Sequence, residues 1–158
     1  MIYITVGSQK FQFDRLFKEI DKIQTSLQHE IFAQIGYSNY IPKNFGYSRF
    51  IDYEDHISTL KKCDILICHG GTSSIIEGLK YQKQVIVVPR LAEFGEHVDD
   101  HQLEISSVFE HKNLVKQVLN EKDLLSIILN INKNNFNKYS FDNSSLLKSI
   151  KESTYNFL

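Results

Sequence analysis

The sequence predicts an α/β fold built on a single Rossmann-like, doubly wound and mainly parallel sheet. Short apolar segments alternate with stretches of helical periodicity along the whole chain, which is typical of βαβ units. The segments 64–68 and 84–89 are apolar without alternation, as expected of strands that helices cover on both faces. The chain has 158 residues, of which 42% are hydrophobic, so one domain spanning 1–158 with a substantial core is expected.

Six strands and the helices between them follow from the pattern. The expected strands are 2–6, 30–35, 48–51, 64–68, 84–89 and, more weakly, 114–118. The first helix is indicated by apolar residues three and four apart, namely Phe13, Leu16, Phe17, Ile20, Ile23 and Leu27. Further helices are expected at 54–62, from about 73, at 97–109, at 121–131 and at 142–155. The last has an apolar face, which either packs on its own domain or docks on a partner chain.

The charge balance excludes one class of function. Lys+Arg number 18 and Asp+Glu 19, which gives a net charge of -1, so the chain lacks the broad basic face of a nucleic-acid binder. Any phosphate must be held locally. No apolar run approaches the roughly 18 residues of a spanning helix, and the opening MIYITVG is not a charged-then-apolar leader. A cytoplasmic protein is therefore expected.

The segment CDILICHGGTSSIIEGL, residues 63–79, carries the strongest chemical signal. A buried strand ends at His69, two glycines follow, and three hydroxyl residues open a helix that carries Glu77. In a doubly wound sheet, ligands lie at the carboxyl ends of the strands. Glycines allow a close backbone approach, and the free N–H groups and dipole of a helix N-terminus attract anions. The turn therefore predicts a diphosphate site, with Glu77 one turn further along, where it could accept two ribose hydroxyls.

A purely structural interpretation of the same segment is a capping box, in which Ser73 or Ser74 caps the helix and Glu77 completes the box. That interpretation leaves His69 and the double glycine without a reason. Other motifs fail on spacing, because the chain has no GxxxxGK[ST], no GxGxxG in this turn and no GxSxG.

Three motifs in order, HGGTSSIIE, QVIVVPR and EHVDDHQ, resemble the donor-binding half of GT-B glycosyltransferases. Together with ITVGSQKFQFDRLFKEID and FAQIGYSNYIP, they resemble the stand-alone C-terminal-domain subunits of glycosyltransferase family 28 over about residues 1–118. These include the PssE-type subunits of exopolysaccharide and capsule galactosyltransferases, and the small donor-binding subunit of the dolichol-linked N-acetylglucosaminyltransferase. The departure is Ser73, where many relatives have glycine.

The resemblance implies a set of substrate-binding residues. The diphosphate would be surrounded by His69, Gly70, Gly71, Thr72, Ser73 and Ser74. Glu77 would hold the ribose, and Gln102, with His101 and Asp100 beside it, would contact the sugar. Gly7 and Ser8 would border the phosphates or the sugar, and Phe50 and Ile51 would lie against the base. No metal and no cofactor are implied, because the UDP-sugar is itself the donor substrate.

The resemblance also implies a reaction and a partner. The chain would be the donor-binding subunit of a two-subunit hexosyltransferase that moves a hexose, galactose by the closer likeness, to a polyprenyl-diphosphate-linked acceptor. The general base would lie on a membrane-anchored acceptor-binding subunit, through which this chain would be peripheral to the inner face of the membrane. Arg90 and the terminal helix are candidates for the contact surface. Alternatives are transfer of N-acetylglucosamine, and a UDP-sugar-binding subunit that activates a partner without catalysis.

A different class of enzyme is suggested by HVDDH, residues 97–101. The spacing places His97 and His101 at positions i and i+4 on one helical face, and the pattern approximates a metalloprotease motif with Asp in place of Glu. A metallohydrolase is therefore a remote alternative. His56 and His111 are expected at the surface.

Overall fold

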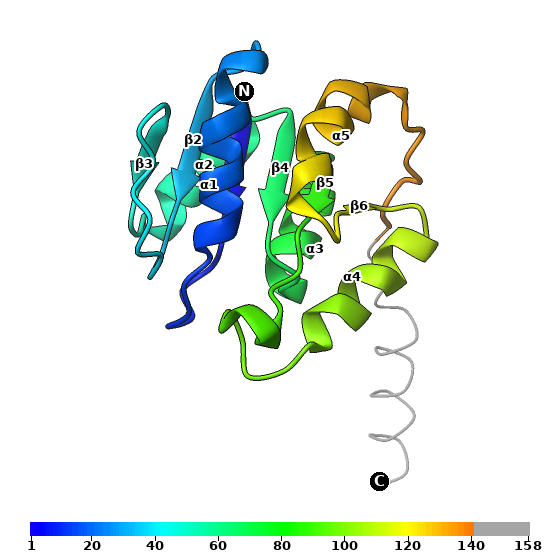
Figure 1. Ribbon diagram of the computed structural model, residues 1–158. Helices are drawn as coiled ribbons and strands as arrows, with labels where there is room; N and C mark the ends of the chain where they lie inside the picture. The colour runs from blue at the N-terminus through cyan, green and yellow to red at the C-terminus, as the bar shows by residue number, and fades with distance from the viewer. Residues whose placement is uncertain (141–158) are drawn as a thin grey trace, which may run out of the picture.

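A computed structural model describes residues 1–140 (Figure 1). Six strands form one sheet in the order β3-β2-β1-β4-β5-β6, and every neighbouring pair is parallel. The predicted fold class is therefore confirmed. The strands are β1 (Ile2–Thr5), β2 (Ile31–Gln34), β3 (Gly46–Ser48), β4 (Ile65–Cys68), β5 (Gln84–Val87) and β6 (Lys116–Gln117). The helix predicted at 142–155 lies outside the described residues.

Residues 1–140 contain five α-helices, of which four lie between strands and the fifth follows β6. They are α1 (Asp14–Ile23), α2 (Tyr53–Lys62), α3 (Thr72–Lys80), α4 (His101–His111) and α5 (Leu124–Asn130). Short 3₁₀ turns add η1 (Gln24–Ser26), η2 (Ala92–Phe94), η3 (Glu121–Asp123) and η4 (Ile131–Lys133). None of the helices in residues 1–140 has the length and apolar character needed to cross a bilayer.

Helices cover both faces of the sheet, which explains the unbroken apolar strands. In β4, Ile65 and Ile67 join the core cluster that includes α1 and α5, whereas Leu66 and Cys68 join the cluster that includes α2 and α3. Figure 1 shows α1 and α5 on the near side of the sheet. Because each strand must bury both sets of side chains, no polar alternation is possible in it.

Two predicted boundaries are wrong. The third strand is Gly46–Ser48 rather than 48–51, because it is a short edge strand whose residues are all at least partly exposed and carry little apolar signal. The fourth helix begins at His101 rather than at His97. Residues 97–100 instead belong to the loop after β5, where Asp100 Oδ1 accepts a hydrogen bond from the Ala92 N–H at 2.8 Å.

The connections of the sheet reverse direction at its centre. β1 and β4 are neighbours, but the chain leaves β1 toward α1 on one face and leaves β4 toward α3 on the other. In doubly wound sheets such a switch point, at the carboxyl ends of the strands, is where ligands bind. The turn predicted to bind diphosphate therefore lies at the position that this rule selects.

Arg90 holds the loops at this edge. Its side chain is fully buried, so it is not part of a contact surface, contrary to the sequence-based expectation. One guanidinium nitrogen donates to the carbonyl oxygen of Val6 at 2.9 Å, and the other donates to those of Phe11, Gln12 and Glu96 at 3.0 to 3.2 Å. The loop after β1 and the loop after β5 are thus tied to one cation.

A second arginine completes this network from α1. Arg15 donates through Nε to both carboxylate oxygens of the buried Glu96, at 2.9 and 3.1 Å, and through Nη2 to the carbonyl oxygen of Pro89 at 2.7 Å. Burial lowers the pKa of Arg90 to about 10 and raises the pKa of Glu96 above its ordinary value. The ion pair and the carbonyl oxygens compensate for the loss of hydration that buried charges suffer.

We predict that Arg90→Met lowers the free energy of unfolding by about 3 kcal/mol or more, because it leaves four buried carbonyl oxygens without their donor. Urea unfolding measures the change. Arg49→Met is the matched control, since Arg49 is exposed and donates to two carbonyl oxygens, those of Gly36 and Ser38, and its loss should cost within about 1 kcal/mol. Equal losses in both variants would contradict the role given to Arg90.

Candidate functional site

The predicted site residues gather at the carboxyl edge of the sheet. Gly7 and Ser8 follow β1, Phe50 and Ile51 follow β3, and residues 69–74 follow β4. Residues 101 and 102 open α4 after the loop from β5, and Glu77 lies in the second turn of α3. Four loops far apart in the sequence therefore meet at one end of the molecule, which is the lower end in Figure 1.

His69 is enclosed by two glycines. Gly7 has a φ of 69°, a left-handed conformation, and a Cβ at this position would lie 2.9 Å from His69 Cε1. A Cβ on Gly71 would lie 2.4 Å from His69 Nε2, which no side chain could tolerate without displacing the ring. The glycines of this turn are therefore needed for the packing of the imidazole, which the sequence alone did not indicate.

The His69 side chain is 7% exposed, and its Nδ1 has no hydrogen-bond partner within residues 1–140. Burial, and then the positive charge of Arg90, lower the pKa of His69 to about 4. The ring is therefore neutral at pH 7 and offers one N–H donor and one acceptor. A buried polar atom without a partner is uncommon in folded proteins and indicates a site that a ligand or water can satisfy.

The N-terminus of α3 is open. Its N-cap is Gly71, and within the described part of the chain no side chain caps it. Thr72 and Ser73 are exposed in the first turn, and Ser74 is half-buried. The capping-box interpretation is therefore wrong, since neither Ser73 nor Ser74 is the cap. The first-turn N–H groups and the helix dipole are left available to an anion.

Gln102 joins two strand ends. It is 2% exposed, and its Oε1 accepts hydrogen bonds from the backbone N–H groups of Gly70 at 3.0 Å and Arg90 at 3.2 Å. An amide oxygen has two lone pairs, and both are used here. The resemblance implies that this amide contacts the sugar, and these two hydrogen bonds leave only its nitrogen for that purpose.

Glu77 has a neighbour that sequence reasoning missed. His56, on α2, places Nε2 3.1 Å from Glu77 Oε2, and its Nδ1 lies 2.8 Å from the hydroxyl of Tyr3 on β1. The His56 side chain is 15% exposed, so the expectation of a surface residue is wrong. No sequence signal marks this contact, because the three residues lie on three different elements.

The HVDDH segment forms a cluster, but not on a helix. Because α4 begins at His101, His97 does not share a helical face with it, and the metalloprotease premise is wrong. Instead Asp99 Oδ1 contacts Nδ1 of both His97 and His101, and these three ligand atoms lie within 4.8 Å of one another. Such a group could hold a metal ion. Asp99 already accepts from the His101 backbone N–H as well, which accounts for its position without one.

The segment predicted to meet the base is partly open. Phe50 is 44% exposed, and its ring packs edge-on against that of Tyr37 at a centroid distance of 5.2 Å. The carbonyl oxygen of Phe50 accepts a hydrogen bond from the Ser48 hydroxyl at 2.8 Å. Ile51 is half-buried and packs against the core cluster of α2 and α3.

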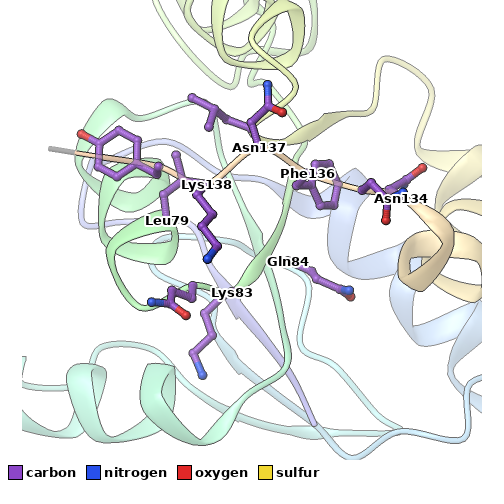
Figure 2. A pocket seen from close by; sticks show the side chains of 11 residues that line it. Leu79, Lys83, Gln84, Asn134, Phe136, Asn137 and Lys138 are labelled. Atoms are coloured by element: carbon purple, nitrogen blue, oxygen red, sulfur yellow. The ribbon is translucent and has the colours of Figure 1, made fainter.

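A hollow of about 400 Å³ lies at the other edge of the sheet. Figure 2 shows Lys83, which precedes β5, and Gln84, the first residue of β5, lining it with Phe136 and Asn137. None of the predicted site residues lines it. Because it lies at the amino ends of the parallel strands, it falls outside the region where doubly wound sheets bind ligands.

We predict that His69 makes stability depend on pH. Between pH 6.5 and 4 the unfolded chain binds a proton at this ring and the folded chain does not, so the free energy of unfolding falls as the pH falls through this window. The loss attributable to His69 is on the order of 3 kcal/mol. Urea unfolding at a series of pH values should show a flatter profile for His69→Asn, whereas the exposed His111→Asn should keep the parental slope. A parental slope in His69→Asn would contradict the prediction.

Comparisons with known proteins agree with this geometry. Three solved structures are similar in fold. The glycotransferase of kitacinnamycin has a TM-score of 0.64 and 15% sequence identity, and the match covers 82% of this chain and 34% of that chain. MurG of Acinetobacter baumannii has a TM-score of 0.56 and 19% identity, with coverage of 82% and 42%, and the glycosyltransferase SnogD from Streptomyces nogalater has a TM-score of 0.53 and 19% identity, with coverage of 77% and 31%. The chain thus matches less than half the length of each. No curated protein sequence matches it.

The sheet corresponds to the C-terminal halves of GT-B glycosyltransferases. The family model of the glycosyltransferase family 28 C-terminal domain matches residues 1–154, nearly the whole chain. The chain therefore belongs to glycosyltransferase family 28, as a C-terminal domain of that family.

Proposed function

We propose that this chain is the donor-binding subunit of a two-subunit glycosyltransferase, which transfers a hexose from a UDP-sugar to a polyprenyl-diphosphate-linked acceptor in exopolysaccharide or capsule synthesis. The observation that carries the proposal is the open N-terminus of α3 at the switch point, directly after the buried imidazole of His69, whose Nδ1 has no partner among residues 1–140. Family membership supports the donor class. Galactose and the partner subunit rest on the resemblance to PssE-type subunits.

The diphosphate would be bound by the turn at residues 69–74. Its backbone N–H groups and the α3 dipole supply positive potential without a basic side chain, and the hydroxyls of Thr72 and Ser73 are exposed beside them. Gly7 and Ser8 would border the same space. As the bond to the sugar breaks, negative charge grows on the leaving diphosphate, and fixed donors aimed at that charge stabilise the transition state.

The remaining contacts complete the donor. Glu77 would accept the ribose hydroxyls, and Phe50 and Ile51 would lie against the uracil. The Gln102 amide nitrogen and the exposed His101 would donate to sugar hydroxyls. The general base that activates the acceptor hydroxyl is proposed on the partner subunit, which would be membrane-anchored and would bring this chain to the inner face of the membrane.

The test is a thermal-shift titration of the purified chain with UDP, UDP-galactose, UDP-N-acetylglucosamine and ADP. A ligand at 100 times its dissociation constant should stabilise the fold by about 2.7 kcal/mol. We expect Ser73→Glu to abolish the response to UDP compounds, because its carboxylate would repel the diphosphate, while the same charge near a helix N-terminus does not harm folding. Ser126→Glu, also exposed in the first turn of a helix, should leave the response unchanged.

Three other outcomes would contradict parts of the proposal. Stabilisation by UDP compounds that survives Ser73→Glu would place the ligand elsewhere. Binding without transfer, even with the partner present, would favour a non-catalytic activating subunit, and selective stabilisation by UDP-N-acetylglucosamine would change the sugar.

A further inference from the structure

The Glu77 carboxylate is the end of a hydrogen-bonded chain that starts in the core. Tyr3 lies in the central strand β1 and is fully buried. Its hydroxyl is 2.8 Å from His56 Nδ1, and His56 Nε2 is 3.1 Å from Glu77 Oε2. The Tyr3 and His56 rings also touch, with centroids 5.5 Å apart. One side chain of α2 thus links the first strand to the second turn of α3.

The direction of these hydrogen bonds follows from the partners. Burial raises the pKa of Tyr3 far above its ordinary value, so the phenol keeps its proton. Its O–H can donate to Nδ1 of the imidazole, which places the ring proton on Nε2, from where it donates to the carboxylate. The Tyr3 hydroxyl, both ring nitrogens of His56 and Glu77 Oε2 then each have a complementary partner.

This arrangement occupies one carboxylate oxygen and leaves the other. The Glu77 side chain is 30% exposed, and no hydrogen bond to Oε1 is found among the described residues. An unrestrained glutamate has three rotatable bonds and loses considerable entropy when a ligand fixes it. A carboxylate already fixed by the protein binds its ligand at a smaller entropic cost.

We propose that His56 is a positioning residue, which with Tyr3 behind it holds the Glu77 carboxylate ready to accept the 2′- and 3′-hydroxyls of the donor ribose. The inference rests on the proposed function, in which Glu77 contacts that ribose. His56 would not touch the donor. Its contribution is to select nucleoside diphosphates that carry both ribose hydroxyls over those that lack them.

Isothermal titration calorimetry with UDP and with 2′,3′-dideoxyuridine diphosphate tests this directly. We expect the parent chain to prefer UDP and His56→Leu to bind UDP about tenfold more weakly, the change that one lost charge-assisted hydrogen bond ordinarily causes. Binding of the dideoxy compound should be unchanged. His56→Gln, which keeps a donor and an acceptor, should recover part of the preference, and the surface variant His111→Leu should behave like the parent. In a Glu77→Ala background, His56→Leu should have no further effect on UDP binding.

The outcomes separate the inference from the proposed function. Failure of the parent to bind either nucleotide would overturn both. If the parent binds both compounds equally, or if His56→Leu keeps the full preference for UDP, the inference fails while diphosphate binding stands. If His56→Leu weakens the binding of both compounds equally, the role of His56 is merely structural and the inference is overturned. It is also overturned if His56→Leu still weakens UDP binding in the Glu77→Ala background.

Discussion

The candidate site depends on one buried cation. The Arg90 guanidinium is surrounded by carbonyl oxygens from the loop after β1 and the loop after β5, and the Phe13 ring lies 5.0 Å from it. The backbone N–H of the same residue donates to Gln102, which also receives the Gly70 N–H. The loops after β1, β4 and β5 are therefore connected through Arg90 and the glutamine, and the shape of the site follows from that connection.

This arrangement also sets the electrostatics of the site. Because the arginine is fully buried, its charge is used within the protein, where it helps to keep His69 neutral. The turn at residues 69–74 contains no lysine or arginine. Attraction for an anion must therefore come from backbone dipoles and hydroxyls, which is consistent with a chain whose overall charge is close to zero. In the proposed function, such a site would hold the diphosphate by geometry, since its donors are fixed before the ligand arrives.

Much of the fold could be predicted because it is recorded in local patterns. The layered arrangement of helices around a parallel sheet could be predicted from the unbroken apolar runs of β4 and β5 and from the helical period of α1. A parallel sheet in turn places the turn after His69 at the carboxyl ends of the strands. The start of α4 could not be found, because residues 97–100 resemble a first helical turn in composition. They form a loop instead, which is fixed by contacts such as that of Asp100 with Ala92. The exposed edge strand β3 was misplaced because almost none of it is buried.

The sequence indicated which residues gather at the carboxyl edge of the sheet, but it did not indicate how they interact. The residues at 69–74 could be found because a double glycine and three hydroxyls are unusual together. Arg90 and His56 were both expected at the surface, since polar residues usually are. Their partners include Tyr3, 53 positions from His56, and Val6, 84 positions from Arg90, and such pairings leave no trace in a local pattern. The full engagement of the Gln102 oxygen has the same cause.

The distances along the sequence have a kinetic consequence. The hydrogen bonds of Arg90 to Phe11 and Val6 join residues 79 and 84 positions apart, and closing such long loops costs entropy before any bond repays it. The strands can pair before these loops meet, so the binding turn is expected to be among the last parts of the molecule to form. Interactions made after the folding barrier mainly slow unfolding. The buried arginine would then affect the rate at which the site unfolds more than the rate at which it forms.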